Sequence, residues 1–187
     1  MPTALHEEID DASRQGGCMP DWRRAASVAA HPSNRLVDEG MLSSIASGLA
    51  QVTLPWELRT GDVPAERRYE RVLSTVAYDA WVTYWPAGIE LDLHDHGGSS
   101  GAFSVVAGRL DEDSVVDGQR HTVQLAAGET VEFGPGHVHA VSNRTLGPAT
   151  SVHVYSPPLT AMSYYDTEGT GALCVVGEDV GPWKDRA

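Results

Sequence analysis

From Tyr69 onward, short apolar runs alternate with glycine, proline and aspartate, and this texture constrains the fold more than any other feature. Turn residues recur about every 8–12 positions, a spacing typical of an all-β sandwich or barrel. Six segments read as strands: Val76–Trp85, Phe103–Leu110, Thr122–Leu125, Thr130–Phe133, Val138–Val141 and Thr150–Tyr155. Ala172–Val176 is a candidate for a late strand. The sequence therefore predicts an all-β fold for most of the chain.

The residues before this region have a helical pattern instead. Residues 21–52 read as helical, and Asp38 can cap a helix whose apolar residues recur three or four positions apart. Those residues are Met41, Leu42, Ile45, Ala46 and Leu49. Pro55 ends this helix, and Pro64 is placed to start a short second one.

The length and the apolar content bound the organisation of the chain. A chain of 187 residues that is 41% apolar can build one full hydrophobic core and is short for two. We expect a single domain over residues 1–187, with a mostly helical preface over 1–60 and the β-rich core over 65–165. Because the sequence has no apolar run of membrane-spanning length and no signal-peptide pattern at its start, a cytoplasmic location is expected.

The charge and the cysteines exclude several classes of function. The formal net charge of −13 repels phosphate backbones and anionic lipid surfaces, so neither nucleic acid nor a membrane is an expected partner. Cys18 and Cys174 have no metal-binding spacing and are too few for a disulfide framework. We therefore assign neither cysteine a chemical role.

Two histidine pairs are the strongest chemical signal in the sequence. Residues two apart on a strand point to the same face, so His94 and His96 are expected to supply two ligands of a metal site. Imidazole suits divalent iron, nickel, zinc and copper. The second pair, His137 and His139, offers a third ligand, and the strand pattern alone leaves open which of the two it is.

Both pairs lie in runs that resemble the two motifs of the cupin proteins. The order Gly88, His94, His96 and then Gly108 is similar to the first motif. The run from Pro135 through His139 to Asn143 is similar to the second. The resemblance implies a cupin barrel with N-terminal helices, and it implies His139 as the third ligand, with His137 as the alternative.

One residue of the usual first motif is missing. Cupins commonly carry a glutamate ligand that is separated from the second histidine by three or four intervening residues, where this chain has Ser100 and Gly101. A three-histidine site is the mark of the thiol dioxygenases among the cupins. Trp85, nine residues before His94, and the run from His94 to Gly101 resemble bacterial members of the cysteine dioxygenase type I family over about residues 65–165.

A segment near the end of the chain strengthens this resemblance. In the family, residues matching Ser151, His153 and Tyr155 form a hydrogen-bonded chain beside the metal, and on a strand these three would share one face. The resemblance implies that they are catalytic. It also implies a cis peptide bond between Ser156 and Pro157.

Three arginines lie close together in the segment that the sequence match assigns to substrate recognition. Arg71 matches the arginine that binds the substrate carboxylate, and a guanidinium suits that task. Arg67 and Arg68 are nearby competitors. Met162 and Tyr164 are expected to line the pocket, and Tyr155 also faces the substrate.

The resemblance implies a dioxygenase that adds O2 to the sulfur of L-cysteine, giving cysteine sulfinic acid, at an Fe(II) centre, with Ni(II) also possible. The alternatives are 3-mercaptopropionate or another thiol acid as substrate, oxidation beyond the sulfinate, and a metal- or ligand-binding cupin module without catalysis. In animal members, a cysteine crosslinked to the pocket tyrosine stands where this chain has Gly101, so no thioether crosslink is expected.

Overall fold

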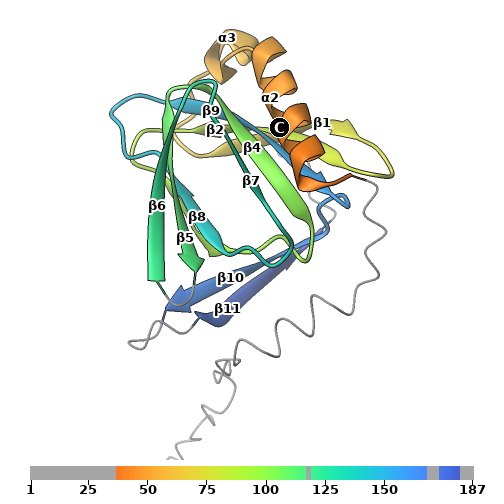
Figure 1. Ribbon diagram of the computed structural model, residues 1–187. Helices are drawn as coiled ribbons and strands as arrows, with labels where there is room; N and C mark the ends of the chain where they lie inside the picture. The colour runs from red at the N-terminus through yellow and green to blue at the C-terminus, as the bar shows by residue number, and fades with distance from the viewer. Residues whose placement is uncertain (1–36, 117–118, 168–172, 182–187) are drawn as a thin grey trace, which may run out of the picture.

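The computed structural model describes residues 37–116, 119–167 and 173–181, and within them eleven strands build two antiparallel sheets (Figure 1). The strands are β1 (Arg68–Ser74), β2 (Asp79–Trp85), β3 (Glu90–His94), β4 (Ser100–Ala107), β5 (Arg109–Val116), β6 (Gln119–Ala126), β7 (Thr130–Phe133), β8 (His139–Ser142), β9 (Ala149–Ser156), β10 (Ala161–Thr167) and β11 (Leu173–Val180). The expected all-β fold is confirmed.

Each sheet mixes strands from distant parts of the chain. The five-stranded sheet has the order β1-β2-β9-β4-β7, and the six-stranded sheet has the order β11-β10-β3-β8-β5-β6. Consecutive strands such as β3 and β4 therefore lie in different sheets. The two sheets face each other and enclose an interior, into which β2, β3, β8 and β9 each contribute side chains of the candidate site (Figure 1).

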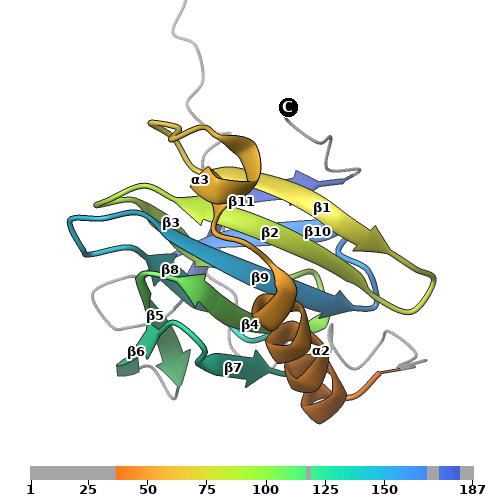
Figure 2. The same ribbon diagram turned by 90° about the horizontal axis from the view of Figure 1, so that it is seen from above.

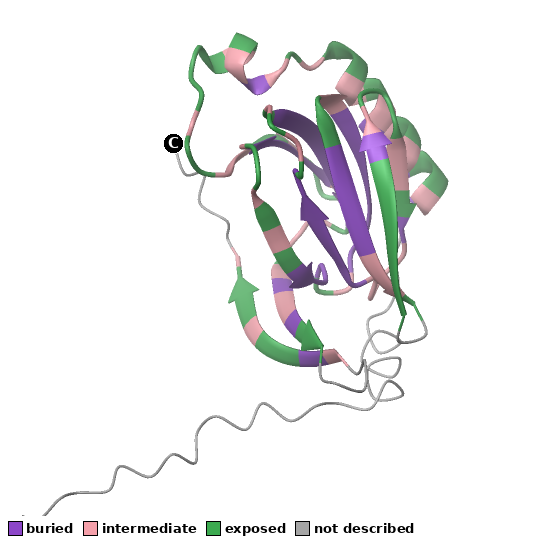
Figure 3. Cartoon of the chain, turned by 90° about the vertical axis from the view of Figure 1, so that its left-hand side faces the viewer, coloured by how far each residue is buried: buried purple, intermediate pink, exposed green. Residues whose placement is uncertain are grey.

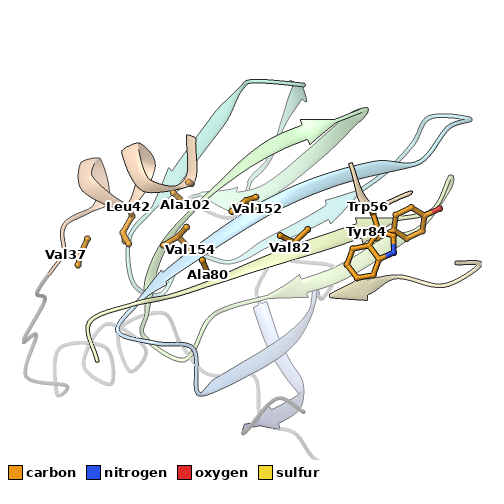
Figure 4. Close-up of a cluster of buried hydrophobic side chains, with 10 residues drawn as sticks. Val37, Leu42, Trp56, Ala80, Val82, Tyr84, Ala102, Val152 and Val154 are labelled. Atoms are coloured by element: carbon orange, nitrogen blue, oxygen red, sulfur yellow. The ribbon is translucent and has the colours of Figure 1, made fainter. Parts of the chain in front are cut away.

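Two helices cover the outer face of the five-stranded sheet. Helix α2 (Glu39–Val52) runs across β4, β7 and β9, and α3 (Trp56–Thr60) follows it (Figure 2). Leu42 and Ala46 of α2 are fully buried against this sheet. Figure 4 shows their cluster, in which Trp56 packs beside Tyr84 with ring centroids 5.9 Å apart.

The helices explain why the central strands are apolar on one face and chemically active on the other. All residues of β2 and β9 are buried, which Figure 3 shows as continuous purple ribbons. On β9, Val152 and Val154 join the cluster beneath the helices, whereas His153 and Tyr155 line the interior pocket. Strand alternation thus separates the core from the site.

Several local predictions are confirmed. Asp38 caps α2, since its carboxylate accepts a hydrogen bond from the backbone N–H of Met41. The Ser156–Pro157 bond is cis. The late strand expected over Ala172–Val176 corresponds to β11, although Ala172 lies outside the described residues, as do Cys18 and the part of the 21–52 helical segment before residue 37.

Other local predictions are wrong. Pro64 does not start a helix, because the residues after it enter β1, which pairs with β2; sheet pairing overrides the local helix signal. The expected strand Phe103–Leu110 is divided at Gly108, whose positive φ of 79° ends β4 before β5. Strand β10 was not predicted.

Within the described residues, no helix combines the length and the apolarity that a membrane crossing requires.

Candidate metal centre

Three histidines converge in the interior between the sheets. His94 ends β3, His139 begins β8, and the two are direct partners in the antiparallel ladder. His96 follows two residues after His94, and the ligand atoms of all three lie within 4.8 Å of one another. Each side chain is at most 2% exposed. This group could hold a metal ion.

His96 reaches the centre although β3 ends before it. The backbone N–H of Asp95 donates to the carbonyl of Ser163 on β10, and the Asp95 carboxylate accepts from Tyr165 Oη at 2.6 Å. Asp95 therefore points away from the two histidines, as strand alternation predicts, and ties their segment to β10.

The free nitrogens of these rings suit a metal. His94 Nδ1 donates to the backbone carbonyl of Asp92 at 2.7 Å. The Nε2 atom of the same ring therefore keeps its lone pair and can bind a metal ion. His96 Nε2 is buried and has no hydrogen-bond partner among the described residues. Burial, followed by the neighbouring imidazoles, lowers the pKa of His94 and of His96 well below its ordinary value, so both rings are neutral and able to ligate. The residues present therefore fit a metal.

The second histidine pair separates into two roles. His139 belongs to the three-histidine group, whereas the ring of His137, whose side chain is 25% exposed, lies beside Glu112 with Nε2 3.2 Å from Oε1. Glu112 Oε1 also lies 2.6 Å from His139 Nδ1. Burial alone would raise the pKa of Glu112, but its hydrogen bonds to the two histidines lower it to about 2.

Ser151, His153 and Tyr155 form a continuous hydrogen-bonded chain. Ser151 Oγ lies 2.8 Å from His153 Nε2, and Tyr155 Oη lies 3.3 Å from His153 Nδ1. Trp85 Nε1 donates to Ser151 Oγ at 2.8 Å. Because indole can only donate, Ser151 is free to donate its own proton to His153 Nε2, which places the imidazole proton on Nδ1, facing Tyr155.

Burial keeps this chain uncharged. The pKa of His153 is lowered to about 3, chiefly by desolvation, and burial raises the pKa of the Tyr155 phenol. The ring of Tyr155 lies 4.9 Å from that of His96, centroid to centroid. With His153 donating to its oxygen, Tyr155 can direct its own O–H toward the pocket.

A pocket of about 310 Å³ opens beside the metal centre. His94, His139, His153 and Tyr155 line it, together with Trp81, Trp85, Met162 and Tyr164. Met162 and Tyr164, which the sequence predicts near the pocket, are both among its lining residues. Among the described residues, the pocket is also lined by two arginines, Arg67 and Arg68.

Arg67 is the arginine next to the site. Its guanidinium lies 5.4 Å from the Trp85 ring and 5.5 Å from the Tyr69 ring, and it forms no ion pair within the described part of the chain. Burial lowers its pKa, yet a guanidinium remains charged. Arg68 lies 3.6 Å from Glu66 in an ion pair whose two side chains are exposed.

Arg71, the residue favoured by the sequence match, is not among the pocket-lining residues. It is exposed, and its guanidinium lies 5.3 Å from the Trp81 ring. Tyr69 and Arg71 lie on β1 and Arg67 lies just before it, each two residues from the next, so the sequence could not tell which arginine would reach the interior. The pairing of β1 with β2 decides it by placing Arg67 near Trp85.

Three residues of the site have no motif that could have revealed them. Glu112 lies between Asp111 and Asp113, and such an acidic run is typical of a solvent-exposed strand. Phe133 looks like an ordinary core aromatic, yet it stacks on His96 with ring centroids 4.8 Å apart. Asp179 lines the pocket from β11 and accepts a hydrogen bond from Tyr164 Oη at 3.1 Å.

Comparison with known proteins agrees with this geometry. The model of the family described as cysteine dioxygenase type I matches residues 62–168, which is more than half of the chain. The chain belongs to the cysteine dioxygenase type I family. Together with the two facing antiparallel sheets, this membership confirms the expected cupin fold and indicates a metal-dependent oxygenase.

Two solved structures are among those to which this chain is similar. A cupin superfamily protein from Desulfitobacterium hafniense is 8% identical with a TM-score of 0.47, covering 55% of this chain and 88% of that chain. A Klebsiella pneumoniae protein with a double-stranded β-helix domain is 24% identical with a TM-score of 0.45, covering 51% and 81%. At these identities the likeness concerns the fold alone.

Proposed function

We propose that this protein is a thiol dioxygenase that adds both atoms of O2 to the sulfur of L-cysteine and forms cysteine sulfinic acid. The reaction balances as one thiol and one dioxygen giving one sulfinic acid. The observation that carries the proposal is the three-histidine group beside a pocket that also contains the Arg67 guanidinium.

His94, His96 and His139 would hold a ferrous ion through neutral imidazole nitrogens. The chemistry that this ion supplies when bound is the activation of dioxygen next to a thiolate sulfur. Three protein ligands leave positions for substrate and dioxygen, and the uncompensated charge of the ion favours a thiolate. Because imidazole does not distinguish strongly between iron and nickel, nickel is the alternative metal.

Arg67 would bind the carboxylate of the substrate. A planar guanidinium offers two parallel N–H donors, and the desolvated surroundings of Arg67 strengthen such a pair. Fixing the carboxylate aims the thiol at the metal and lowers the entropic cost of the reaction. Arg67 thus takes the role that the sequence match gave to Arg71.

Tyr155 would donate a hydrogen bond to substrate or oxygen atoms at the metal. Ser151 and His153 hold the phenol from behind, and His153 donates to its oxygen, so its proton is directed into the pocket. Met162 and the aromatic rings of the pocket reduce the access of water.

A thiol acid without an amine, such as 3-mercaptopropionate, is the second candidate substrate. The observation that favours it is the position of Arg67, which differs from that of the arginine expected in cysteine-specific members. Arg67 recognises a carboxylate, a group that both thiols carry.

The test is anaerobic loading with ferrous iron, followed by oxygen uptake with L-cysteine and with 3-mercaptopropionate and identification of the products by mass spectrometry. A gain of two oxygen atoms on cysteine that is lost in His94→Ala supports the proposal. Faster turnover of 3-mercaptopropionate than of L-cysteine would make 3-mercaptopropionate the proposed substrate instead. Turnover with nickel alone, or a product other than the sulfinate, would reject the reaction. Metal binding without turnover of either thiol would favour a binding module.

A further inference from the structure

A buried carboxylate lies directly behind the third histidine of the metal centre. Glu112 Oε1 is 2.6 Å from His139 Nδ1, and the two side chains are 4% and 1% exposed. We propose that Glu112, held in place by His137, is a positioning residue that fixes His139 toward the metal and strengthens it as a ligand. The inference deepens the proposed function and rests on it for the presence of a metal at this site.

The hydrogen bond determines which nitrogen of His139 can ligate. An ionised carboxylate only accepts, so Nδ1 of His139 must carry the proton, and Nε2 on the far side of the ring keeps its lone pair. The ring also packs against those of His94 and His96, with centroids 4.8 Å and 5.0 Å away. A ligating imidazole that donates its other N–H to a carboxylate is held in one orientation and becomes more basic.

His94 provides an internal comparison. Its Nδ1 donates to the backbone carbonyl of Asp92, which is a neutral acceptor. His139 donates to a full negative charge, and charge-assisted hydrogen bonds are about twice as strong as neutral ones. His139 is therefore expected to be the stronger of these two ligands.

Glu112 also compensates in part for the carboxylate that the first motif lacks. Three neutral imidazoles leave the whole charge of a divalent ion unbalanced in a buried site. A carboxylate one hydrogen bond behind a ligand returns a negative charge to the centre without occupying a coordination position. A directly bound glutamate would instead occupy one of the positions that substrate and dioxygen can use.

His137 holds the carboxylate from its other side. His137 Nε2 lies 3.2 Å from the same Oε1 of Glu112, and its ring stacks on Phe133 with an interplanar angle of 16°. Glu112, His137 and His139 also have ligand atoms within 4.8 Å of one another, so they form a second possible metal group that shares His139. The positioning role predicts one metal ion per chain, whereas a second site predicts two.

The test is anaerobic titration of the metal-free full-length protein with Co(II), read by visible absorption and calorimetry. Glu112→Gln keeps an oxygen acceptor and removes the charge, and we expect metal affinity to fall about 10- to 100-fold with a changed Co(II) spectrum. Glu112→Asp keeps the negative charge but places it farther from His139, because the aspartate side chain is shorter. This variant should recover part of the lost metal affinity. Glu132→Gln, at an exposed position on β7, is the matched control and should bind like the unmodified protein.

Unchanged affinity and spectrum in Glu112→Gln would overturn the inference. So would binding of two ions per chain with loss of only one in that variant, since Glu112 would then be a ligand. The titration uses metal without thiol, so its result does not depend on the substrate. Absence of oxygen uptake by the iron-loaded protein would count against the proposed function and not against this role of Glu112.

Discussion

The ring of Phe133 occupies the space that a side chain on Gly101 would need: a Cβ atom at residue 101 would lie 2.5 Å from Cε2 and Cζ of Phe133. Phe133 stacks on His96 on one side, with centroids 4.8 Å apart, and on His137 on the other, with centroids 5.4 Å apart. Neither the glutamate ligand of other cupins nor a crosslinking cysteine can be accommodated at residue 101 beside this ring. Gly101 and Phe133 form one structural unit that supports the ring of His96.

Gly101→Ala should therefore destabilise the protein and weaken metal binding. Forcing a methyl group into this packed site is expected to cost about 1–3 kcal/mol in the free energy of unfolding, since Phe133 is buried and backed by two rings. Denaturant unfolding of the metal-free protein measures the first effect, and Co(II) titration measures the second.

Gly48→Ala in α2 is the matched control, because a Cβ there meets no atom within 4 Å. It should leave stability equal or slightly higher, since alanine favours helix. The double variant Gly101→Ala with Phe133→Leu should recover part of the loss. Equal stability of Gly101→Ala and the control would show that Phe133 does not exclude a side chain.

The arginine of the pocket gives a prediction on substrate binding. Arg67→Ala should raise KM for a thiol acid about 10- to 150-fold, because charged hydrogen bonds contribute about 1.5–3 kcal/mol. Arg67→Lys keeps the charge but loses the planar pair of N–H donors, so its KM should lie between those of the unmodified protein and Arg67→Ala. Arg71→Ala, at a nearby position on β1 that does not line the pocket, is the control and should change KM little. Steady-state oxygen uptake decides, and a larger effect at Arg71 than at Arg67 would reverse the assignment.

The phenol of Tyr155 gives a prediction on turnover. Tyr155→Phe removes the O–H that faces the pocket, so kcat should fall by about 10²-fold, with a smaller change in KM. Ser151→Ala should have a weaker effect of the same kind, because it acts through His153. Tyr78→Phe, outside the pocket, is the control. A Tyr155→Phe variant with normal kcat would remove Tyr155 from the reaction.

Asn143 gives a prediction on stability. It is 0% exposed, donates from Nδ2 to the carbonyls of Trp85 and Gly147, and accepts at Oδ1 from the backbone N–H of Thr145. Asn143→Ala leaves buried partners unsatisfied and should cost about 2–4 kcal/mol. Thermal and denaturant unfolding measure the loss of stability, with Gln124→Ala at an exposed position on β6 as the control. Equal stabilities of the two variants would show that the hydrogen bonds of Asn143 do not stabilise the fold.

Strand alternation made much of the site predictable from the sequence. Ser151, His153 and Tyr155 lie two apart on β9 and share a side because neighbouring side chains of a strand point to opposite faces. His94 and His96 keep the same relationship although β3 ends at His94. Likewise, the Asp38 cap depends on residues three apart. Such local relationships survive folding with little change.

What the sequence could not show depends on pairing between distant strands. Glu112 reaches His139 because β5 lies beside β8, with Glu112 opposite Val141. Arg67 rather than Arg71 lines the pocket because of the register of β1 on β2. Similarly, the exclusion at Gly101 depends on β7 lying beside β4. No spacing within one segment carries this information.

Isotope labelling tests whether both atoms of dioxygen are added to a thiol sulfur at the three-histidine centre. The iron-loaded protein is given L-cysteine and ¹⁸O₂ in ordinary water, and the product is analysed by mass spectrometry, with His139→Ala as the inactive control. The proposed dioxygenase activity predicts a sulfinate in which both added oxygen atoms carry the label. A product with one labelled oxygen or none, or equal turnover by His139→Ala, would contradict it.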